Sequence, residues 1–98
     1  MPTLHIALLD GFSGQAVAIR VAGREVYRRD GVKTDLRISR ADETAAETPT
    51  GAVHVEVEAA GRTAAIQIDA ARTPHLRVDR GDDGALALRP SNEPAAFL

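Results

Sequence analysis

Three histidines are the residues of this chain best suited to binding a metal ion. His5, His54 and His75 fall on predicted outward faces of strands, and Glu56 and Glu58 closely follow the second of them. Imidazoles converging from three strands, beside a carboxylate, could hold Zn²⁺ or another divalent ion. No two of the histidines share a ligand spacing such as H-x-H or H-x-x-x-H. We therefore expect exposed strand histidines, and we predict no metal ligands and no cofactor.

The segment 79–84, Asp-Arg-Gly-Asp-Asp-Gly, gathers carboxylates around glycines. It is similar to a calcium loop, but it lacks the acidic spacing and the terminal bidentate Glu of an EF-hand. It also contains Arg80-Gly81-Asp82, which resembles the tripeptide that integrin ligands present, although so short a match often arises by chance. We interpret the segment as a hairpin turn.

Nucleophilic catalysis has little support in the sequence. Ser13, Ser39 and Ser91 have no neighbouring His, and the G-x-S-x-G motif is absent. The chain has no cysteine, which excludes thiolate catalysis, thiolate metal sites and disulfides. We expect a protein that is not an enzyme. The alternative is a small metal-dependent hydrolase that uses the outward histidines and acidic residues.

A group of basic side chains surrounds one predicted hairpin and could bind phosphate or an acidic partner. The group comprises Arg24, Arg28, Arg29, Lys33 and Arg37. Only one aromatic residue, Tyr27, lies among them, and one stacking side chain is too few to indicate binding of single-stranded nucleic acid. Charges on edge strands also block unwanted pairing, and we prefer this protective role. Arg28, Arg29 and Lys33 stay as possible partner-binding residues.

The C-terminal segment 93–98, Glu-Pro-Ala-Ala-Phe-Leu, ends a polar stretch with two large apolar residues. Burying Phe97 and Leu98 would contribute about 2 kcal/mol each. The tail either folds back over its own core or docks on another copy or a partner. We therefore add Phe97 and Leu98 to the possible partner-binding residues, and we expect a protein partner or a homo-oligomer.

Composition limits the range of folds and partners. The 98 residues fit one domain, residues 1–98, with 90–98 as a tail. The core must be aliphatic, because the chain has no Trp, one Tyr and two Phe. The net charge of −2 argues against a nucleic-acid binder. Residues 1–40 carry seven basic and four acidic side chains, whereas 41–98 carry five basic and ten acidic ones. Such opposite patches could favour association.

No apolar run approaches the roughly 20 residues of a membrane span, and no secretory leader is visible. We expect a cytoplasmic protein without membrane contact. A regulatory or accessory domain of a larger polypeptide is a further alternative.

The segment 52–69 organises the predicted fold. Val53, Val55, Val57 and Ala59 alternate with polar or small residues, and a second alternating run follows Ala60-Gly61. A period of two predicts a central β-hairpin with one buried face. Further strands are predicted at 3–9, 16–21, 25–28, 32–38, 75–79 and 85–89.

Two segments admit alternatives. Asp30-Gly31 is a strong hairpin signal, either as a two-residue loop or as a three-residue loop 29–31. The three-residue loop separates the two faces better, with Leu36 and Ile38 inward, so we prefer it. Residues 41–50 could form one helical turn or a short edge strand, and we favour the strand.

The whole pattern of seven or eight short strands, with turn signals about every ten residues, is typical of a sandwich or small barrel. No helix-length periodic segment competes with it. We predict an all-β protein, an antiparallel β-sandwich of the Ig-like or transthyretin-like kind with little or no helix.

Two stretches carry a family resemblance: 21–26, Val-Ala-Gly-Arg-Glu-Val, and 49–57, Pro-Thr-Gly-Ala-Val-His-Val-Glu-Val. Together they resemble small bacterial sandwich modules of the transthyretin-like and carboxypeptidase-regulatory type, over roughly residues 16–69. The resemblance implies an accessory or binding module, and no catalytic residue can be transferred with it. We therefore expect a non-enzymatic binding or assembly module.

Overall fold

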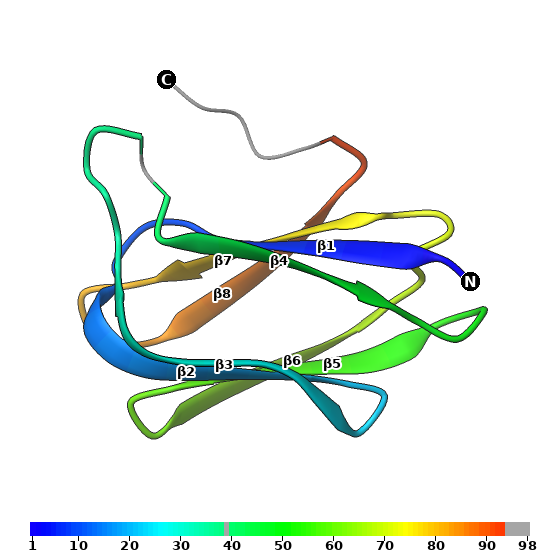
Figure 1. Ribbon diagram of the computed structural model, residues 1–98, viewed down its shortest axis with the longest axis horizontal. Helices are drawn as coiled ribbons and strands as arrows, with labels where there is room; N and C mark the ends of the chain where they lie inside the picture. Colours follow the sequence, from blue (N-terminus) through cyan, green and yellow to red (C-terminus); the bar gives the residue numbers. More distant parts are fainter. Residues whose placement is uncertain (39, 94–98) are drawn as a thin grey trace.

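The computed structural model describes residues 1–38 and 40–93, and this part of the chain is all-β, with eight strands in two sheets and no helix (Figure 1). The strands are β1 (Thr3–Leu8), β2 (Ser13–Val21), β3 (Arg24–Lys33), β4 (Asp42–Glu47), β5 (Val53–Ala59), β6 (Arg62–Ile68), β7 (His75–Arg80) and β8 (Leu86–Ser91). Sheet A has the strand order β4-β1-β7-β8, and sheet B has the order β3-β2-β5-β6. In these residues no helix is long and apolar enough to cross a membrane.

Aliphatic side chains from both sheets form one core. Successive side chains of a strand point to opposite faces, so every second residue of a strand can be buried. The predicted inward residues of segments 3–9, 16–21, 52–59 and 75–79 are confirmed as buried. They are Leu4, Ile6 and Leu8 of β1, Val17, Ile19 and Val21 of β2, Val53, Val55, Val57 and Ala59 of β5, and Leu76 and Val78 of β7.

The predicted hairpin at 52–69 is confirmed as β5 and β6. Its loop is the pair Ala60-Gly61, with φ of 50° and 80°. Positive φ at both loop residues is the signature of a type I′ turn, the connection that matches the twist of a two-residue hairpin. The register runs from Ala59 opposite Arg62 to Val53 opposite Ile68 without a shift. β5 is an interior strand of sheet B, and β6 is its edge.

The predicted hairpin at Asp30-Gly31 is wrong. Both residues lie inside β3, which pairs with β2 along its length. Between Arg29 and Val32, β3 holds one residue more than β2 does, and Gly31 has a φ of 69° there. A β-bulge uses the positive φ of glycine as a hairpin turn does. The dipeptide therefore marks a bulge.

The strand predicted at 32–38 is also wrong beyond Lys33. The partner of Lys33 is Ser13, the first residue of β2, so no strand of sheet B is left to pair with the chain that follows. It makes a turn instead, in which the N–H of Ile38 donates to the carbonyl of Asp35 at 3.2 Å. Leu36 and Ile38, predicted inward, are 88% and 38% exposed.

Segment 42–47 forms the edge strand β4, which confirms the strand interpretation over the helical turn. The expected wholly antiparallel arrangement is wrong at one pair, because β1 and β7 are parallel, from His5 opposite His75 to Leu8 opposite Val78. A parallel pair needs a long connection. Strands β2 to β6 lie between β1 and β7 in the sequence, and they supply that connection.

At the C-terminal end, β8 continues through Pro90 to Ser91, which belong to the segment expected as a tail. Proline is tolerated on an edge strand because its missing N–H can face solvent. Phe97 and Leu98 lie outside the described residues.

Gly11 provides a test of how the turn between β1 and β2 packs on β7. Its φ is +89°, and a Cβ built there would lie 1.7 Å from the carbonyl oxygen of Arg80. We expect Gly11→Ala to lower the free energy of unfolding by about 2–4 kcal/mol, because the β7 backbone must move as well. Urea denaturation measures the loss.

Gly14→Ala is the matched control. Gly14 also has a positive φ, +111°, but no atom lies within 4 Å of its built Cβ. Backbone strain alone predicts a loss of about 1–2 kcal/mol. Equal losses in the two variants would contradict the close approach of Gly11 to Arg80.

Candidate functional site

The sheet edges are the surfaces on which this fold leaves backbone groups unpaired. β3 and β6 border sheet B, and β4 and β8 border sheet A. The N–H and C=O groups of an edge strand can pair with another chain unless charge, proline, bulges or a covering element prevents it. The side chains of each edge strand therefore decide whether that edge can bind.

Three of the predicted partner-binding residues lie on β3, but the strand separates them. Arg28 is opposite Ala18 and shares its outer face, whereas Arg29 is opposite the buried Val17 and faces sheet A. Lys33 follows the bulge at the end of the strand. Because neighbouring side chains of a strand point to opposite faces, Arg28 and Arg29 do not form one basic patch.

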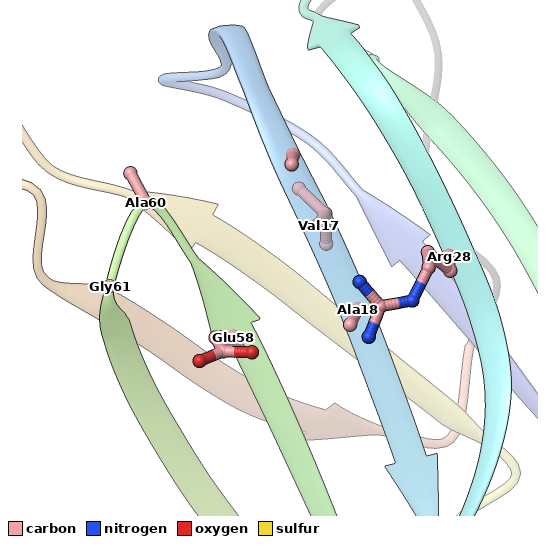
Figure 2. Close-up of a pocket in the computed structure, with 7 residues that line it drawn as sticks. Val17, Ala18, Arg28, Glu58, Ala60 and Gly61 are labelled. Atoms are coloured by element: carbon pink, nitrogen blue, oxygen red, sulfur yellow. The ribbon is translucent and has the colours of Figure 1, made fainter.

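Arg28 borders a hollow of about 180 Å³ on the outer face of sheet B. Figure 2 shows its guanidinium lying across Ala18 toward Glu58 of β5, with the turn at Gly61 beyond. The Nε of Arg28 also donates to Glu25 at 2.5 Å. A cation and a carboxylate around a small residue suit a small zwitterion, but ligand pockets usually exceed about 300 Å³. We assign no ligand to this hollow.

One carboxylate links the edges of the two sheets where β3 faces β4. The hydroxyl of Tyr27 donates to Oδ2 of Asp42 at 2.6 Å, and Nη1 of Arg29 donates to the same oxygen at 2.8 Å. The other oxygen of Asp42 accepts the N–H of Glu43 at 2.8 Å. Charges turned inward at an edge oppose pairing with another chain. The hydrogen bonds to Asp42 therefore protect both edge strands, β3 and β4, against pairing with another chain.

Charge and proline protect the remaining length of two edges. In β4, antiparallel pairing of two copies would place Asp42 opposite Glu47 of the second copy, and like charges directly opposite are destabilising. In β8, Pro90 has no N–H to donate. Arg89 of the same strand is bound to Asp79 of β7.

Among the described edges, β6 has none of these devices beyond its first residue. Its only charged residue, Arg62, is the first of the strand and donates to the carbonyl of Asp83 at 3.2 Å. Thr63, Ala65 and Gln67 are exposed and uncharged. The register with β5 contains no bulge. Beyond Arg62, β6 is therefore a regular, uncharged strand that is hydrogen-bonded on one side only.

The β5–β6 turn determines which backbone groups of β6 face away from β5. A type I′ turn is closed by a hydrogen bond between its first and fourth residues, here Ala59 and Arg62. Hydrogen-bonded and non-hydrogen-bonded pairs then alternate along an antiparallel ladder. Thr63, Ala65 and Gln67 therefore direct their N–H and C=O groups away from β5. We call these three residues the free edge of β6.

Of the three histidines, the structure brings two together. His5 and His75 lie directly opposite in the parallel pair, with ring centroids 5.1 Å apart and an interplanar angle of 25°. His54 lies on β5 of the other sheet, on the strand that also carries Glu56 and Glu58. In residues 1–38 and 40–93, no group of three or more His, Asp or Glu side chains is placed to hold a metal ion.

The segment 79–84 contains the end of β7 and the turn into β8, as predicted. The N–H of Gly81 donates to the carbonyl of Ala85 at 2.8 Å, and the N–H of Gly84 donates to the carbonyl of Gly81 at 2.9 Å. Oδ1 of Asp83 accepts the N–H of Ala85 at 3.0 Å. These contacts explain the glycines and one carboxylate of the segment as hairpin structure.

No protein-family model, curated protein or solved structure matches this chain.

The link at Asp42 predicts an unusual titration of Tyr27. Burial, and then the hydrogen bond and charge of Asp42, raise the pKa of Tyr27 above its ordinary value. Tyr27 is the only tyrosine and the chain has no Trp, so phenolate absorbance reports on it alone. We expect the Tyr27 hydroxyl to ionise well above pH 10 in the folded protein, and at about pH 10 in the urea-unfolded chain.

The free energy of unfolding should depend on pH through the same contact between Tyr27 and Asp42. The folded state holds the proton of the Tyr27 hydroxyl more tightly than the unfolded chain does, and this difference adds to the free energy of unfolding. The added stability is complete below a pH of about 10 and is lost as the pH rises through the raised pKa of Tyr27. Tyr27→Phe should remove this part of the alkaline destabilisation. A folded protein whose tyrosine titrates at about pH 10 would contradict the buried contact with Asp42.

Proposed function

We propose that this protein is a non-enzymatic assembly module that pairs with a second copy of itself through the free edge of β6. One observation carries the proposal: β6 is a regular strand with exposed, uncharged Thr63, Ala65 and Gln67. The other edges of the described chain carry inward charges, like charges or proline. An unprotected edge strand is a template for pairing with another chain.

The sequence of β6 suits pairing about a two-fold axis. With antiparallel strands centred on Ala65, this residue meets its own copy, and Thr63 meets Gln67 of the second copy. Each hydrogen-bonded pair exchanges two bonds, so the free edge would form about six. All three positions are neutral, so no like charges meet, as an interface between identical surfaces requires.

Pairing of two copies at this edge would also bury apolar side chains of β6 further. Ala64 and Ile66 point toward the core, yet both are only half-buried because β6 has no neighbour on its outer side. The symmetric pairing brings Ala64 next to Ile66 of the second copy. Apolar area removed from water contributes about 25 cal/mol per Å², which adds to the backbone hydrogen bonds.

The fold of the module is proposed to be a β-sandwich of the transthyretin-like or immunoglobulin-like kind. Two four-stranded sheets that share one aliphatic core support this assignment. We also propose that the protein is cytoplasmic, that its partner is a protein, and that it does not bind nucleic acid. The separation of Arg28 and Arg29 onto different faces of β3 supports the last point, because it divides the basic group.

Ala65→Lys tests the interface. Ala65 is exposed and pairs with Glu56 of β5, so a lysine is accommodated within one chain. In the dimer, however, the two lysines would lie directly opposite each other at the two-fold axis. We expect the wild type to be a dimer and Ala65→Lys a monomer, as measured by light scattering.

Ala87→Lys is the matched control, because Ala87 is also an exposed edge-strand alanine opposite a carboxylate, Asp79. This variant should stay dimeric. A mixture of Ala65→Lys with Ala65→Glu should restore a dimer that neither forms alone. A wild type that is monomeric at about 1 mM, or equal effects of the two lysine variants, would contradict the proposal.

A further inference from the structure

His5 and His75 form a stacked pair on the outer face of sheet A. Leu4 and Ile6, which flank His5, and Leu76, which follows His75, are buried on the inner face. The N–H of His5 donates to the carbonyl of Pro74 at 2.8 Å, which holds the two backbones together beside the pair. Both histidines are half-buried. Two imidazoles are thus held side by side on a sheet backbone.

The separation of the rings is close to what a shared metal ion needs. An imidazole nitrogen binds a metal at about 2.0–2.1 Å, so two of them at tetrahedral or square-planar angles lie about 2.8–3.4 Å apart. The ring centroids are 5.1 Å apart, and the two stacked ring planes are inclined to each other by 25°. Rotation about χ2, which is soft for histidine, can bring one nitrogen of each ring to the required distance.

The positions next to the histidines across the sheet carry small side chains. Ala45 of β4 is opposite His5, and Ser91 of β8 is opposite His75. The Ser91 hydroxyl donates to the backbone carbonyl of Glu93 and accepts its N–H, both at 3.1 Å. No third His, Asp or Glu in the described chain completes a cluster. The protein would therefore supply two nitrogens, with water or another small ligand in the remaining positions.

We propose that His5 and His75 bind one divalent transition-metal ion, with Cu²⁺ bound more tightly than Ni²⁺ or Zn²⁺. Imidazole suits these three ions, and their affinity for a given nitrogen site is greatest at copper. Calcium and magnesium prefer oxygen ligands, so they are not bound here. The site lies in sheet A, whereas the free edge of β6 belongs to sheet B. It therefore does not depend on the proposed assembly.

The test is a calorimetric titration of the full chain with CuCl₂. We expect one Cu²⁺ at this site, and an affinity at least about tenfold lower in His5→Gln and in His75→Gln, because a single imidazole lacks the chelate effect. His54→Gln is the matched control, since His54 lies on β5 of the other sheet, and it should bind as the wild type does. All variants retain the N-terminal amine, so any Cu²⁺ bound there would be common to them.

A second readout needs no variant and so does not depend on how the variants fold. Bound Cu²⁺ is paramagnetic and broadens NMR signals near it. The ring protons of His5 and His75 should broaden at copper concentrations that leave those of His54 sharp. Equal broadening of all three rings, an unchanged affinity in both glutamine variants, or the same loss in His54→Gln would overturn the proposal.

Discussion

The shared aliphatic core is the constraint on which the rest of this structure depends. Without Trp, and with little other aromatic area, the chain joins its sheets through alternating Val, Ile, Leu and Ala side chains. Alternation fixes register, because a slip of one residue would turn every inward side chain outward. It also decides which side chains lie on the outer faces, among them Thr63, Ala65 and Gln67 of sheet B and the two stacked histidines of sheet A.

Two separate sheets leave four edges, and the chain treats them unequally. Asp42 ties β3 to β4 through Tyr27 and Arg29, and Pro90 interrupts β8. Beyond Arg62, β6 is regular and uncharged, with the backbone groups of its free edge unpaired. A protein that had only to stay monomeric would gain from a charge at Thr63, Ala65 or Gln67. The neutral side chains at these three positions support our proposal that β6 serves assembly.

The sequence predicts most of what depends on local pattern. The β5–β6 hairpin follows from its alternation and from Ala60-Gly61. Asp30-Gly31 misleads because a bulge and a hairpin turn both use glycine with positive φ, and only the pairing of β3 with β2 distinguishes them. The His5–His75 pair cannot be read from the sequence, since it depends on parallel strands some 70 residues apart. The link between Tyr27 and Asp42 likewise arises only when the two sheets meet.

Amide hydrogen exchange along β6, measured at several protein concentrations, tests the central claim most directly. The N–H groups of Ala64 and Ile66 point to β5 and should be protected at every concentration. Those of Thr63, Ala65 and Gln67 should exchange fast in dilute protein and become protected as the concentration rises. Fast exchange of these three amides at all concentrations would show that the free edge of β6 does not pair.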